Sequence, residues 1–194
     1  MTSERNSGPG HFRRLAAALT ALALGACASN PPDEPREYLD EMSATTVTVA
    51  PGGLVFARER PELAVHARDY ITLVPLDVNH SGRHAQYFYV YVWSTIDKRG
   101  LPARDASNGQ IELLADGRQI PLVPAATTPR ELGLAVPPVR APSDSAQLLI
   151  APTDRETLEF LSRATDIRVV AQQDGVSYQY ELWSGRGDAI LALL

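Results

Sequence analysis

Hydrophobic and polar residues alternate in short runs over most of the chain, and this period of two predicts β-strands rather than helices. Breaks rich in Gly, Pro, Asn and Asp separate the runs. We expect single strands at 45–49, 54–57, 70–78, 85–96 and 146–151, and two hairpins, 111–115 with 118–122 and 166–172 with 176–183. Pro75 lies inside one of these runs and suggests an edge strand or a β-bulge there, because proline has no backbone N–H to donate.

Only one segment has the pattern of a good helix. Residues 153–156 (Thr-Asp-Arg-Glu) have the form of a capping box, Leu158 and Leu161 follow on one face, and Ala164-Thr165 should end the helix. The remaining segments are expected to be a loose helical turn at 38–43, a proline-rich loop at 124–145 with one short strand at 132–136, and an apolar tail at 188–194 that docks on the body.

These elements predict a mainly β fold in one domain, which we place at 44–194 of the 194 residues. Many short strands and one late helix are typical of an antiparallel β-sandwich of immunoglobulin-like type, with the helix as a crossover between the sheets. A small β-barrel is the alternative.

The first 26 residues differ from the rest and have the form of an export signal. Residues 1–14 are polar and end in Arg13-Arg14, and an apolar run follows at 15–26. At about 1.5 Å per residue, that run would span only about 18 Å as a helix, too short for a bilayer core of about 30 Å. Cys27, the single cysteine, follows directly.

Leu24-Gly25-Ala26-Cys27 resembles the lipobox of bacterial lipoproteins. The resemblance implies cleavage before Cys27 and attachment of fatty acyl chains to it, which makes residues 27–43 a lipidated cysteine with a flexible, proline-containing tether. Ala28 and Ser29 follow the cysteine where an aspartate would resemble an inner-membrane retention signal. The resemblance therefore implies a location on the periplasmic face of the outer membrane.

The body also resembles a group of small bacterial envelope lipoproteins with no assigned activity. The resemblance covers roughly residues 38–185 and is carried by Arg68-Asp69-Tyr70-Ile71, Asp77-Val78-Asn79 and Trp93-Ser94-Thr95-Ile96-Asp97. It supports the location and the fold, and it implies no chemistry.

The most informative candidate site is a row of aromatic residues, Tyr87, Tyr89, Tyr91 and Trp93, which a strand would place on one face. The opposite face carries Phe88, Val90 and Val92, so both faces are bulky. If the row is exposed, it could bind a partner protein or a glycan. Otherwise residues 124–145, the helix or the tail cover it. Tyr178, Tyr180 and Leu182 repeat the spacing on a later strand and would extend the patch if the two strands were neighbours.

Catalytic and metal-binding patterns are weak. His66, His80 and His84 are the only candidates for a metal site, and the serines have no nucleophile-elbow motif. The carboxylate pair Asp40-Glu41 should be solvated. We expect no cofactor. Removal of residues 1–26, which carry three arginines and one glutamate, leaves a chain more acidic than the whole-chain net charge of −5, which disfavours nucleic acid as a partner.

The sequence therefore favours a non-enzymatic, lipid-anchored module that binds another envelope protein. A glycan-binding module, or a metal-dependent envelope hydrolase using the three histidines, are the alternatives.

Overall fold

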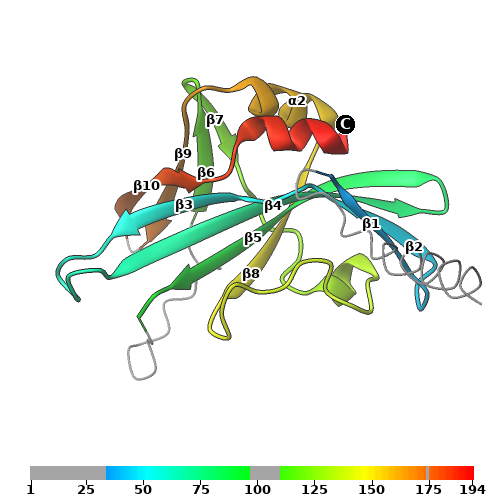
Figure 1. Ribbon diagram of the computed structural model, residues 1–194, viewed down its shortest axis with the longest axis horizontal. Coiled ribbons are helices and arrows are strands. Elements are labelled where there is room, and N and C mark those ends of the chain that lie inside the picture. The colour runs from blue at the N-terminus through cyan, green and yellow to red at the C-terminus, as the bar shows by residue number, and fades with distance from the viewer. Residues whose placement is uncertain (1–33, 97–109, 174) are drawn as a thin grey trace, which may run out of the picture. The chain divides into compact units, whose positions relative to one another are not determined.

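The computed structural model describes residues 34–96, 110–173 and 175–194, and within them the fold is mainly β and antiparallel (Figure 1). Ten strands form one hydrogen-bonded sheet that curls into a half-barrel. The strands are β1 (Arg36–Asp40), β2 (Thr45–Val49), β3 (Leu54–Glu59), β4 (Arg68–His80), β5 (Arg83–Ser94), β6 (Gln110–Ala115), β7 (Arg118–Pro121), β8 (Gln147–Thr153), β9 (Ile167–Gln173) and β10 (Val176–Ser184). The expected immunoglobulin-like sandwich of two separate sheets is not confirmed.

The thirteen-residue strand β4 is the centre of the sheet. One of its edges pairs with β5, which pairs in turn with β8. Its other edge pairs with β3 from Arg68 to Leu73 and with β2 from Leu76 to His80, so the sheet divides into two branches there. Pro75 lies at this division and its carbonyl accepts a hydrogen bond from the backbone N–H of Ala50. The predicted edge strand or β-bulge at Pro75 is thus wrong. A central strand tolerates the proline because the position of its missing N–H falls in the gap between β3 and β2.

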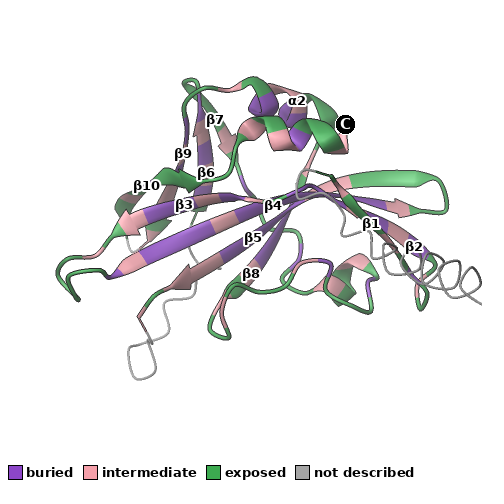
Figure 2. Cartoon of the chain, in the orientation of Figure 1, coloured by how far each residue is buried: buried purple, intermediate pink, exposed green. Residues whose placement is uncertain are grey.

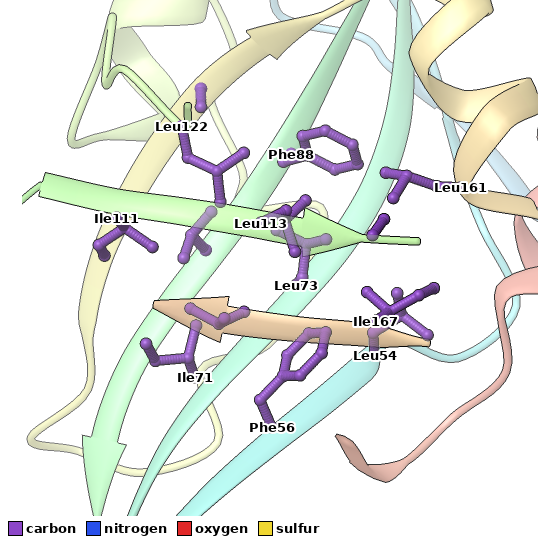
Figure 3. Close-up of a cluster of buried hydrophobic side chains, with 14 of the residues drawn as sticks. Leu54, Phe56, Ile71, Leu73, Phe88, Ile111, Leu113, Leu122, Leu161 and Ile167 are labelled. Carbon is purple, nitrogen blue, oxygen red and sulfur yellow. The ribbon is translucent and has the colours of Figure 1, made fainter. Parts of the chain in front are cut away.

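The β3 branch continues through β10, β9 and β6 to β7. Figure 3 shows how this branch turns back over the sheet, so that β6 and β9 cross above β3, β4 and β5. Large apolar side chains from both parts meet between them and form the main core, among them Leu54, Phe56, Ile71, Leu73, Phe88, Leu113 and Val169. The helix α2 (Arg155–Arg163) adds Leu158 and Leu161, and the 3-10 helix η3 (Gly187–Leu193) adds Ile190. The docking predicted for the apolar tail is confirmed.

Local turn chemistry explains the two tight hairpins. Ser81-Gly82 and Asp116-Gly117 both have positive φ at each residue, with values of 53°, 85°, 45° and 83° in chain order. This is the backbone that two-residue hairpins with right-handed twist require. Helix α2 starts one residue later than a capping box at 153–156 implies, because Asp154 is the N-cap and its carboxylate accepts the N–H of Thr157 at 2.7 Å.

Two expectations from the sequence are wrong. Residues 36–40, placed in a tether and a helical turn, form strand β1, which pairs with β2 over its whole length. The strand expected at 132–136 is replaced by the 3-10 helix η2 (Pro129–Leu132), which ends at Gly133 with φ of 77°. Since β1 pairs with β2, the sheet begins before residue 44.

Candidate functional site

The aromatic row lies on the face of β5 that points away from the main core, and most of it is covered. Tyr89 and Tyr91 are 0% and 4% exposed, whereas Tyr87 and Trp93 are half-buried. The hydroxyl of Tyr91 donates to the carbonyl of Val139 at 2.8 Å. The prediction of an exposed binding surface is therefore wrong for Tyr89 and Tyr91, because the segment 124–146, which we call the covering segment, packs over them. This is the alternative in which residues 124–145 cover the row.

This packing makes a second apolar cluster, which we call the outer cluster. It joins the valines of β2, the outer residues of β4 and β5, and Ala126 and Leu134 of the covering segment. Ala126 also bridges to Ile150 of β8 and so ties the segment to the edge of the sheet. Figure 2 shows the result: β4 and β5 are buried along the middle, become exposed toward the hairpin that joins them, and β5 is half-buried toward its other end.

Asp40 fixes the covering segment in place. Its carboxylate is buried, with the residue 5% exposed, and accepts the N–H of Ala135 at 2.6 Å and that of Met42 at 3.1 Å. Burial by itself raises the pKa of Asp40. The backbone hydrogen bonds to its carboxylate, first that from Ala135, together lower the pKa by more than burial raises it, so the pKa lies below its ordinary value. The expectation of a solvated carboxylate at Asp40 is wrong.

Trp93, at the end of the row, belongs to a group of side chains in which Tyr70 is buried, Arg68 and Trp93 are half-buried and Trp183 is exposed. Its ring stacks on Tyr70 with centroids 4.3 Å apart, and its Nε1 donates to the hydroxyl of Thr72 at 3.0 Å. Arg68 lies two residues from Tyr70 and therefore on the same face of β4. Its guanidinium carbon lies 4.4 Å from the ring centroid of Trp183, which is 57% exposed. We call Arg68, Tyr70, Trp93 and Trp183 the tryptophan surface; it holds both tryptophans of the chain.

Sequence reasoning missed Trp183 because β10 and β5 are not neighbours. Strands β3 and β4 lie between them, and Tyr178 and Tyr180 point toward the main core instead of extending the row. Trp183 reaches the outer face at an irregularity in the pairing of β10 with β3, between Leu182 and Ser184. No local sequence pattern predicts such a bulge.

The three histidines do not converge. His84 hydrogen-bonds Asp77 and His80 hydrogen-bonds Thr45, both through Nδ1 at 2.7 Å, at one end of β4. His66 lies in the connection before β4, so the length of that strand, about 40 Å at 3.3 Å per residue, separates it from the others. A hydrolase centred on all three is therefore contradicted. Within the part of the chain that the structure describes, no three His, Cys, Asp or Glu side chains are placed to hold one metal ion.

Cys27 and the predicted export signal lie outside the described residues. Of the helices in the described ranges, none has the length and apolar character needed to cross a bilayer. Comparison of the chain with protein-family models, curated proteins and solved structures gives no match in any of the three.

Proposed function

We propose that this protein is a lipid-anchored, non-enzymatic binding module of the bacterial cell envelope. It is held through Cys27 at the periplasmic face of the outer membrane, and it binds another envelope protein through the tryptophan surface. The observation that carries the proposal is the exposed stack of Trp183 on Arg68, beside the stack of Trp93 on Tyr70.

The composition of this surface fits a protein partner. Trp, Tyr and Arg are the residues that contribute most to protein–protein binding, typically about 2 kcal/mol or more each when they are central. Here they are already ordered: Arg68 pairs with Glu59 at 3.0 Å and Trp93 is fixed by Thr72. These side chains would therefore lose little conformational entropy when a partner binds.

The anchor would hold the start of β1 close to the membrane. Eight residues separate Cys27 from Arg36, where β1 begins. Even fully extended, at about 3.5 Å per residue, they span only about 30 Å. A partner within or near the outer membrane fits this short reach. The location is supported by the lipobox resemblance and by the residues after the cysteine.

Labelled palmitate tests the anchor. Cells should label the wild-type protein, and the Cys27→Ser variant should remain unlabelled. A wild-type protein that stays unlabelled would overturn the lipid-anchored part of the proposal.

Crosslinking in intact cells tests the binding surface. The matched pair is Trp183→Ser and Val123→Ser, since both side chains are exposed, at 57% and 67%, and only the first lies on the tryptophan surface. A protein that crosslinks to the wild type and to Val123→Ser, but not to Trp183→Ser, supports the proposal. Equal crosslinking of both variants would exclude the tryptophan surface as the binding site.

A further inference from the structure

A pocket of about 730 Å³ opens on the inner face of the sheet, at the end of β4 and β5 that lies farthest from the tryptophan surface. Strands β2, β4, β5 and β8 form its floor, and the start of α2 and the end of η3 contribute its walls. Its volume lies in the range of small-molecule sites.

The floor of the pocket is a row of polar side chains that crosses four strands. The strand register aligns Thr48 with Asp77, Asp77 with Gln86, and Gln86 with Thr153. Directly paired residues share a face, so the four side chains stand side by side. Two residues further along β5, Phe88 on this same face belongs to the main core. The inner face therefore changes from apolar to polar at the pocket.

Two of these side chains have polar atoms that are withdrawn from water. Asp77 is 8% exposed, and its carboxylate is held by the imidazole of His84 at 2.7 Å. The hydroxyl oxygen of Thr153 is buried and makes no hydrogen bond to any residue that the structure describes. A buried polar atom without a partner costs free energy, and a rotation of the Thr153 side chain that turns its hydroxyl into the pocket, where a ligand supplies the partner, would recover it.

We infer that this pocket binds a neutral saccharide. Its lining supplies hydroxyl, amide, imidazole and carboxylate groups, which together donate to and accept from sugar hydroxyls. Pro152, Leu193 and Leu194 add apolar surface for the C–H face of a sugar ring.

Charge selects against anionic ligands. The lining carries the carboxylates of Asp77 and Asp154, and its one guanidinium, that of Arg155, already bonds Glu159 at 2.9 Å. The hydrogen bonds to Asp77 from His84 and to Asp154 from the N–H of Thr157 orient these carboxylates but supply no free positive charge for an anion, whereas a neutral ligand needs none.

The test is calorimetric titration of the purified protein with neutral sugars: glucose, galactose, N-acetylglucosamine, maltose, lactose and chitobiose. At least one should bind. Gln86→Leu and Thr153→Val each remove hydrogen-bonding atoms and keep the approximate shape, and each should weaken binding about tenfold, the effect of losing roughly one hydrogen bond to the ligand. Gln119→Leu, an exposed glutamine on β7, is the matched control and should bind as the wild type does.

Two results would overturn the inference: no binding of any of these sugars by the folded wild-type protein, or equal affinity in the pocket variants and in the control. Thermal denaturation of each variant shows whether it is folded, and Thr153→Val remains informative if Gln86→Leu is not. The inference is independent of the proposed partner protein. Trp183→Ser should bind the sugar normally, and Cys27→Ser should too, so failure of the partner or of the anchor is distinguishable from failure of the pocket.

Discussion

Two neighbouring tyrosines on one strand should respond in opposite directions to the same small change. Tyr89→Phe and Tyr91→Phe each remove one hydroxyl from the outer cluster. The hydroxyl of Tyr91 donates to Val139 at 2.8 Å, whereas that of Tyr89 is buried with no hydrogen bond to a described residue. Burial raises the pKa of both phenols, as expected for groups withdrawn from water.

Loss of a satisfied hydrogen bond costs about 1 kcal/mol, and a buried unsatisfied polar group costs about 1–3 kcal/mol. Tyr91→Phe should therefore lower the free energy of unfolding by about 1 kcal/mol, and Tyr89→Phe should raise it by about 1 kcal/mol. For a domain of this size, 1 kcal/mol corresponds to a shift of about 2–4 °C in Tm. The two variants should thus differ by about 4–8 °C.

Urea denaturation followed by tryptophan fluorescence measures both free energies, and the midpoints should move in opposite directions with an unchanged m-value. If Tyr89→Phe destabilises the protein as much as Tyr91→Phe does, the reasoning is refuted, and the hydroxyl of Tyr89 must have a partner such as an internal water.

Two further perturbations test the packing and the burial. Gly185→Ala should prevent stable folding, because Gly185 has φ of 94° and an added Cβ would overlap the carbonyl of Gly53. Gly117→Ala is the matched control: Gly117 has φ of 83° but open space around it, so the change should cost only about 1 kcal/mol. Thermal denaturation compares the two variants, and equal losses of stability would contradict the packing argument. Raising the pH from 10 to 12 should unfold the protein, because burial raises the pKa of Tyr38 to about 12 and also raises those of Tyr89, Tyr91 and Tyr180. Below pH 10 these phenols are neutral in both states, and above it the unfolded chain ionises first, so stability is lost as pH rises toward the folded pKa. Phenolate absorbance and circular dichroism should change together, and ionisation of all seven tyrosines in a folded protein would disprove the burial.

The strands, the hairpins and the helix follow from local causes and could be predicted. The turn at Asp116-Gly117 is set by two residues that tolerate positive φ, and α2 by a capping carboxylate and an apolar stripe. The sheet topology could not be predicted in the same way. Pro75 is compatible with a central strand only because two different strands share one edge of β4, and no property of residues 70–78 reveals that.

The environment of each candidate residue depended on distant segments. Asp40 is buried because the N–H of Ala135, ninety-five residues away, points at it. Tyr89 and Tyr91 are covered by a loop whose sequence has no period to show where it packs. Trp183 stacks on Arg68 across a bulge. Side-chain spacing indicated which residues share a face, but it did not indicate whether that face is open.

The bulky residues on both faces of β5 have one explanation that also locates the two proposed sites. A strand pair covered on both faces needs apolar side chains at nearly every position, as in parallel sheets that are covered by helices. Here the main core covers the inner face of β4 and β5, and the segment 124–146 covers the outer face. Toward one end, polar residues replace apolar ones on the inner face at Asp77 and Gln86. Toward the other, the outer face is left partly open at Trp93. The pocket and the tryptophan surface therefore lie where β4 and β5 are no longer covered on both faces. They are on opposite faces, and Asp77 and Tyr70 are about 24 Å apart along β4 at about 3.4 Å per residue. That separation is the physical reason to expect that a change at Trp183 leaves the saccharide affinity untouched.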